Sequence, residues 1–152
     1  MADKSEIKKQ GLFSELTDAE LDLISKKVVV EQYPKGKPIF QAGETTKGIY
    51  LVKSGKVEIS LMTADGWKQT LAVLADGQIF GELSVIEDKK THGANATAIE
   101  ETAVYRITAD DFKALEKNDT VLMYKIMKTL ARIASRKVNT MNEKLMKLLV
   151  SY

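Results

Sequence analysis

The chain has 152 residues, a formal net charge of +2 and no cysteine. This length fits one domain with a hydrophobic core, and the lack of cysteine excludes disulfides, thiolate catalysis and thiolate-bound zinc or iron–sulfur clusters. The first ten residues lack the apolar segment of a signal peptide and no apolar run approaches the ~20 residues of a membrane span, so we expect a cytoplasmic protein without membrane contact.

A short amphipathic helix is predicted near the N-terminus. Thr17 and Glu20 have the spacing of a capping box, in which each side chain bonds the backbone N–H of the other residue. Leu21, Ile24 and Val28 then supply the buried face of the helix.

Short strands separated by glycine-containing turns fill the middle of the chain. The expected strands are 28–33, 38–40, 49–53, 57–61 and 69–74. The turn at 64–66 joins the last two as a hairpin. Strands that recur at intervals of about 8 to 12 residues predict an antiparallel sandwich or jelly roll.

The segment from Gly77 to Ala98 carries the strongest functional signal. A two-residue strand, Ile79–Phe80, meets a break at Gly81, and residues 82–86 can form one or two helical turns before a polar loop. The first amides of a helix have no partner within it and point outward at the positive end of its dipole. This corner therefore predicts an anion site, with phosphate as the candidate anion.

Two strands and two helices are expected to complete the chain. The strands cover 94–99 and 103–107, Thr108 opens a short helix through Leu115, and Asn118 or Asp119 caps a second helix. No glycine or proline interrupts this second helix from Val121 to the end, so it would span ~45 Å, more than the domain can cover. Apolar residues follow it mostly at spacings of three and four: Leu122, Met123, Ile126, Leu130, Ile133, Val138, Met141, Leu145 and Leu148. We therefore expect a two-fold homodimer through this helix.

The same helix is basic. Residues 121–152 hold seven Lys or Arg and one Glu, which leaves the rest of the chain at about −4. A solvent-exposed polar face of an amphipathic helix explains this charge. Contact with a polyanion is the more specific alternative.

These patterns together resemble the cyclic nucleotide-binding domain family, which includes the bacterial catabolite activator proteins and the regulatory subunits of protein kinase A. The motifs that carry the resemblance are Tyr33-x-Lys35-Gly36, Phe40-x-x-Gly43-Glu44, Tyr50-x-Val52-x-Ser54-Gly55-x-Val57 and Phe80-Gly81-Glu82-Leu83. The resemblance implies a mainly β, α+β fold: an antiparallel β jelly-roll (double-stranded β-helix) barrel with a short N-terminal helix and a long C-terminal helix. It places the β-roll domain at 12–116 and the lid or dimerisation helix at 119–152.

The resemblance also implies a ligand site for cAMP or cGMP, with no metal or other cofactor. Its expected ligand-binding residues are Phe80, Gly81, Glu82, Leu83, Ser84, His92, Gly93 and Ala94. By the resemblance, the amide region of Gly81 faces the cyclic phosphate and Glu82 faces the ribose 2′-hydroxyl. Glu82 also has a ligand-free explanation, as an acid stabilised by the dipole at a helix start.

The chain departs from the family pattern where an arginine usually closes the phosphate site. Aligning 98–102 with the family's Ala-Leu-Glu-Asp-Thr puts His92 at the arginine position and Gly93 at a Ser or Ala position, and no arginine occurs between Met1 and Glu101. With an ordinary pKa of ~6.5, about a quarter of a histidine is charged at pH 7, and it lacks the planar fork of arginine. A solvated loop histidine is the alternative reading, and Lys89 or Lys90 could supply the missing cation.

Two hypotheses about function remain open. The first is a non-enzymatic regulatory sensor that binds a cyclic nucleotide or related small anion weakly and signals through the C-terminal helix. The second is a degenerate fold that binds no nucleotide and serves in dimerisation or protein docking. An enzyme is disfavoured because the single histidine excludes His-pair metal sites and no nucleophile–base pair is apparent. In the catabolite activators, the long helix is followed by a DNA-binding helix-turn-helix. The given sequence ends at Tyr152, within the region of the long helix, so we expect no direct DNA binding by this chain.

Overall fold

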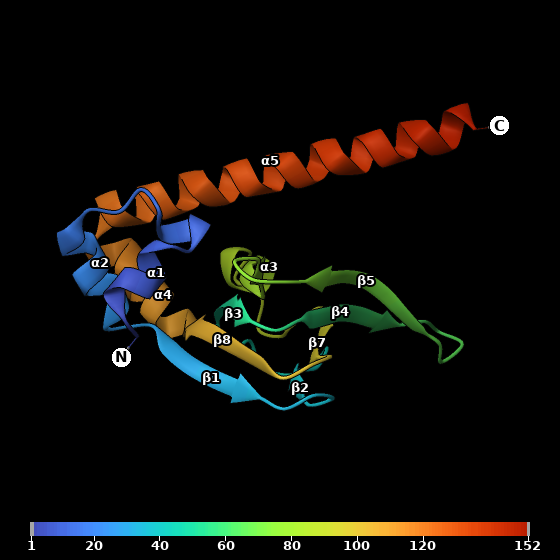
Figure 1. The fold of residues 1–152 in the computed structure, drawn as a ribbon, viewed down its shortest axis with the longest axis horizontal. Coiled ribbons are helices and arrows are strands. Elements are labelled where there is room, and N and C mark those ends of the chain that lie inside the picture. The colour runs from blue at the N-terminus through green and yellow to red at the C-terminus, as the bar shows by residue number, and fades with distance from the viewer. Residues whose placement is uncertain (1, 152) are drawn as a thin grey trace.

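The structure, a computed structural model, describes residues 2–151, and it consists of two antiparallel sheets with the N-terminal helices at one end and the long C-terminal helix running past the sheets (Figure 1). The strands are β1 (Val29–Tyr33), β2 (Pro38–Phe40), β3 (Ile49–Ser54), β4 (Val57–Met62), β5 (Lys68–Leu74), β6 (Ile79–Phe80), β7 (Asn95–Ala98) and β8 (Thr102–Ile107). The helices are α1 (Lys4–Lys8), the 3₁₀ turn Gly11–Phe13, α2 (Asp18–Ser25), α3 (Glu82–Ile86), α4 (Ala109–Asn118) and α5 (Thr120–Val150).

The strand order gives the jelly-roll topology. One sheet has the order β1-β8-β3-β6 and the other β2-β7-β4-β5, with every pair antiparallel. Most neighbours are distant in sequence, so the chain passes repeatedly from one sheet to the other. This arrangement is the double-sheet jelly roll. The predicted fold class is therefore confirmed.

The helical end is held by a core that the sequence partly revealed. The predicted capping box opens α2: the Glu20 amide donates to Thr17 Oγ1 at 3.2 Å, and the Thr17 amide donates to Glu20 Oε1 at 2.8 Å. Leu21 and Ile24 of α2 are fully buried against apolar residues of α4 and α5. Helix α1 was not predicted from the sequence, and it adds the fully buried Ile7 to this core.

A second core fills the space between the sheets and supports the site. Its aromatic members are Phe40, Tyr50 and Phe80, whose ring centroids lie 5.0 to 5.9 Å apart. Tyr50 pairs with Phe80 across β3 and β6, so the chain emerges from this aromatic cluster directly into α3. The end of β6 is therefore fixed in position.

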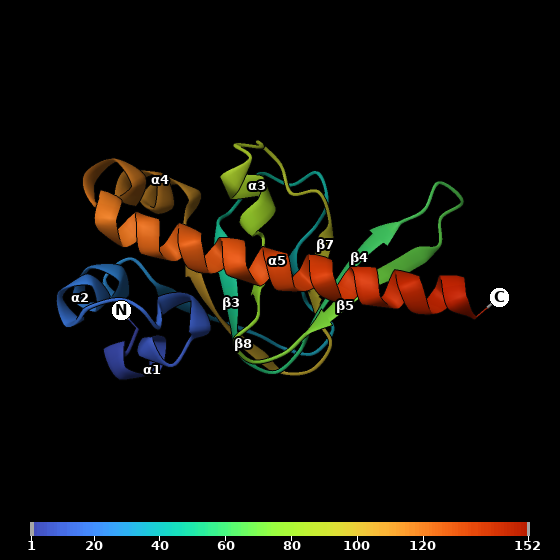
Figure 2. The same ribbon diagram turned by 90° about the horizontal axis from the view of Figure 1, so that it is seen from above.

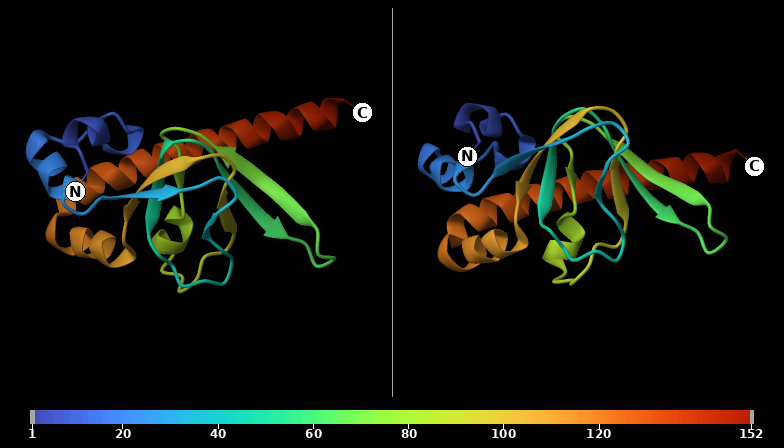
Figure 3. Two further views of the ribbon diagram at one scale, coloured as in Figure 1. Left: turned by 60° about the horizontal axis from the view of Figure 1, so that its bottom comes forward. Right: turned by 90° about the horizontal axis from the view of Figure 1, so that it is seen from below.

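The buried residues of the long helix α5 all lie in its first part, and Figure 2 shows from above that the helix continues past the sheets. Leu122, Met123, Ile126 and Leu130 are buried in the helical core, and α5 runs without interruption to Val150 as predicted. Its C-terminal half and the β4–β5 hairpin project beyond the rest of the barrel in the same direction (Figure 3). No helix within residues 2–151 is both long and apolar enough to cross a bilayer.

The expected division of the chain falls close to a real helix boundary. The helix α4 continues to Asn118, two residues past the expected end of the β-roll domain at 116, and α5 begins at Thr120. Residue 152 lies outside the described residues. The division into a ligand-binding domain and a functional helix stays a prediction.

Candidate functional site

The predicted glycine corner is present and only glycine fits there. Gly81 is the N-cap of α3 with φ +77°, in the left-handed region that glycine adopts without steric cost. A Cβ at this position would lie 2.9 Å from the Gly48 carbonyl oxygen and 3.2 Å from Cδ2 of Tyr50. The backbone at Gly81 therefore packs directly on β3 and turns the chain from β6 into α3.

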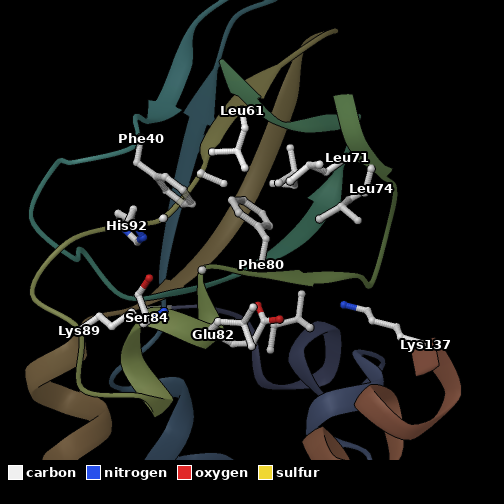
Figure 4. A pocket seen from close by; sticks show the side chains of 17 residues that line it. Phe40, Leu61, Leu71, Leu74, Phe80, Glu82, Ser84, Lys89, His92 and Lys137 are labelled. Carbon is white, nitrogen blue, oxygen red and sulfur yellow. The ribbon is translucent and has the colours of Figure 1, made fainter. Parts of the chain in front are cut away.

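All eight residues of the predicted site line one cavity of about 420 Å³. They are Phe80, Gly81, Glu82, Leu83, Ser84, His92, Gly93 and Ala94. Apolar side chains form most of the remaining wall: Phe40, Ile59, Leu61, Leu71, Ala72, Leu74 and Ile79. A largely apolar cavity of this size with a few polar groups is typical of small-molecule sites. Figure 4 shows the arrangement.

Glu82 is a partly buried carboxylate in the middle of this cavity. Burial raises its pKa, and this outweighs the hydrogen bond from its own backbone amide and the nearby charge of Lys137, which both lower it. An acid whose main role was to stabilise a helix start would show a lowered pKa. The surroundings of Glu82 therefore stabilise its negative charge poorly. A ligand hydroxyl that donates a hydrogen bond to the carboxylate would stabilise this charge.

His92 is buried in the structure, so the reading of a solvated loop histidine is wrong. Its side chain and backbone are 2% exposed. The ring stacks on Phe40 with centroids 3.7 Å apart and planes at 9°, and Nε2 accepts the Lys47 amide at 3.0 Å. The His92 backbone also bonds Glu44 and Gly43, so the residue joins the loop after α3 to the loop after β2.

The surroundings of the buried His92 favour its neutral form. Burial lowers its pKa and the positive charge of Lys47 lowers it further, while the nearby charge of Glu44 acts in the opposite direction. Because Nε2 accepts a hydrogen bond, the proton of the neutral ring lies on Nδ1. His92 can therefore offer one neutral N–H donor to the cavity in place of a guanidinium.

This protonation state can be checked directly because His92 is the only histidine. We expect ¹⁵N-edited NMR of the imidazole to show the Nδ1–H tautomer at pH 7.5, and the pKa to lie below the ordinary value of 6.5. Titration at or above 6.5, or the Nε2–H tautomer, would contradict the geometry described.

The model of one known family matches this chain. The cyclic nucleotide-binding domain model covers residues 30–119, which include the whole cavity wall except for Lys137. The chain belongs to the cyclic nucleotide-binding domain family.

Individual relatives of this cyclic nucleotide-binding domain agree with the assignment. It is 35% identical over 126 residues to the cyclic AMP receptor protein of Thermus thermophilus, covering 83% of this chain and 58% of that protein. It is 33% identical over 95 residues to a cGMP-dependent protein kinase of Toxoplasma gondii, covering 62% of this chain and 9% of the kinase. The crystal structure of the Thermus thermophilus catabolite activator protein superposes with a TM-score of 0.74 at 33% identity, over 91% of this chain and 62% of that one. The chain thus spans about three fifths of the length of the Thermus thermophilus protein.

The lysines that line the cavity differ from the two that the sequence suggested, Lys89 and Lys90. Lys89 lines the cavity, but its ammonium pairs with Glu87 at 2.8 Å, and Lys90 is exposed outside the cavity wall. Lys137, which was not predicted as a site residue, reaches the cavity from α5. Only the path of α5 across the cavity brings Lys137 near Glu82, and no local motif carries that information.

Proposed function

We propose that this chain is a non-enzymatic regulatory sensor that binds a cyclic nucleotide in the cavity beside Gly81 and Glu82. One observation carries the proposal: residues 81–84 and residues 92–94 line the same cavity, and burial in this cavity raises the pKa of the Glu82 carboxylate. The relatives are named for cyclic AMP and cGMP, which are the two candidate ligands. Among residues 2–151, no three His, Asp or Glu side chains gather in a way that could hold a metal ion.

The parts of the cavity match the parts of such a ligand. Backbone amides near Gly81 and Gly93, with the Ser84 hydroxyl, would hold the cyclic phosphate, and Glu82 would accept a hydrogen bond from the ribose 2′-hydroxyl. The apolar wall around Leu71 and Leu74 would cover the base. A hydroxyl bound to an ionised carboxylate gains about 1.5–3 kcal/mol, more than a neutral pair.

The hold on the phosphate is expected to be weak. His92 is neutral and donates at most one N–H, whereas a guanidinium presents two donors with a permanent charge. When one member of a buried charged pair is missing, the binding free energy is ~2 to 5 kcal/mol less favourable, which is roughly a 30-fold to several thousand-fold loss of affinity. We therefore expect a weaker site than one with the arginine.

The cavity and α5 are connected, which supports signalling through the helix. Val85 of α3 lies in the same core cluster as Leu122 and Ile126 of α5, and Lys137 lines the cavity itself. A ligand that moves α3 or contacts Lys137 would shift the position of α5.

Isothermal titration with cAMP and cGMP at low salt tests the proposal, with Glu82→Gln as the matched variant. We expect heat from the wild-type protein and a roughly 3- to 15-fold weaker affinity for Glu82→Gln, because the amide oxygen still accepts the hydrogen bond but lacks the charge that about doubles its strength. No binding of either nucleotide to the wild type below millimolar concentration would defeat the proposal.

The thermal stability of Glu82→Gln provides the folding control. Since the folded state holds the pKa of Glu82 above its ordinary value near 4.5, wild-type stability falls as the pH rises from 4.5 through the folded pKa. Glu82→Gln removes this loss, so it should unfold at a higher temperature than the wild type at pH 7.

The second candidate function is a fold that binds no nucleotide and serves in dimerisation or docking. The neutral His92 favours it, and so does the C-terminal half of α5, where Val138, Met141, Leu145 and Leu148 are 54 to 67% exposed. We call these four residues the α5 seam. Their spacings of three, four and three match the contact positions of a coiled coil, so we propose that a second copy of this chain covers them. The dimer is compatible with both functions, and nucleotide titration distinguishes them.

A further inference from the structure

The polar groups of the cavity lie in an order that orients a bound nucleotide. In Figure 4, Ser84 and His92 lie at one end, Glu82 lies in the middle, and Lys137 enters from α5 at the other end. If the phosphate lies at the corner of Gly81 and the ribose at Glu82, as in the proposed function, the base lies at the end of the cavity where Lys137 enters.

The ammonium of Lys137 is available to a ligand. Within residues 2–151 it forms no salt bridge with a carboxylate, in contrast to Lys89, which pairs with Glu87. Its charge nevertheless reaches Glu82, because it lowers the pKa of that carboxylate. Lys137 therefore lines the cavity as a cation that has no ion-pair partner among residues 2–151.

The chemistry of lysine distinguishes the two purines. An ammonium has three donors and no acceptor. Guanine presents two neighbouring acceptors, N7 and O6, whereas adenine presents the acceptor N7 beside the donor N6–H₂. Stacking on apolar side chains and attraction of a cation to a ring face serve both bases alike, so the donor-only character of Lys137 is what separates them.

We propose that Lys137 makes this site select a guanine nucleotide over an adenine nucleotide. The proposal rests on the proposed function, since it needs a cyclic nucleotide in the cavity. Lys137 is exposed, so it acts at the lower end of the range for base recognition, and we expect cGMP to bind about tenfold more tightly than cAMP.

The test compares cGMP and cAMP affinities by isothermal titration for the wild type, Lys137→Met and Lys144→Met. Methionine keeps the length and helix propensity of lysine without its charge. Lys144 lies two turns further along α5 and does not line the cavity, so it controls for the loss of one positive charge from the helix. We expect Lys137→Met to bring the two affinities within about twofold, mainly by weakening cGMP binding, and Lys144→Met to keep the preference.

Each other outcome overturns the inference. A wild-type preference for cAMP, or a preference for cGMP that survives in Lys137→Met, removes Lys137 as the selecting residue while leaving the proposed function intact. An equal loss for both nucleotides in Lys137→Met would place the lysine at the common phosphate or sugar. Ligand-observed NMR at millimolar nucleotide detects weak binding, and no binding of either nucleotide there overturns the proposed function and this inference together.

Discussion

His92→Arg is expected to strengthen cyclic nucleotide binding by roughly 30-fold to several thousand-fold. The change adds the permanent charge and the paired donors that the neutral His92 lacks, at a position that already lines the cavity. Isothermal titration with cAMP and cGMP at fixed salt measures the change. The gain should shrink at higher ionic strength, because it arises from an ion pair with the phosphate.

The substitution also carries a stability cost that must be measured beside it. Arginine has no acceptor for the Lys47 amide, which now donates to His92 Nε2 at 3.0 Å, and an unsatisfied amide costs ~1 to 3 kcal/mol. The planar guanidinium can still stack on Phe40. His92→Gln is the matched control, because its side-chain oxygen can accept from the amide without adding charge. Unchanged affinity in a folded His92→Arg protein would show that the phosphate does not lie beside this loop.

Leu145→Glu combined with Leu148→Glu is expected to convert the proposed dimer to a monomer. Both leucines belong to the α5 seam and are 54 and 61% exposed in the single chain. In a two-fold dimer both copies contribute these two leucines, so four leucine side chains are buried. At ~1.5 to 3 kcal/mol each, their burial stabilises the dimer by at least about 6 kcal/mol. This raises the dimer dissociation constant by more than about 10⁴-fold.

Sedimentation velocity over a range of concentrations measures this change. Asn139→Glu with Thr140→Glu is the matched control, because it adds the same charges to exposed positions of α5 outside the α5 seam. The control should remain a dimer. A wild-type protein that is monomeric at micromolar concentration would contradict the proposed dimer, and so would loss of the dimer in both double variants.

Local sequence patterns determined most of the fold. The capping box of Thr17 and Glu20 formed as predicted because it depends on residues three apart. The hairpin turn near Gly66 formed because the turn needs a residue that accepts positive φ, and Gly66 has φ +86°. The helix α1 was missed because its five residues gain their stability from the burial of Ile7 rather than from their own pattern.

The sequence also located the cavity, because Phe80, Gly81 and Glu82 are consecutive and their motif encodes a strand, a corner and a helix start. It could not determine the state of His92, whose burial depends on Phe40 and Lys47, contacts that lie about fifty residues away in the chain. Nor could it place Lys137, fifty-five residues beyond Glu82. Charge and protonation in a cavity depend on which distant groups share the same low-dielectric space, and only the packing of the barrel against α5 decides that.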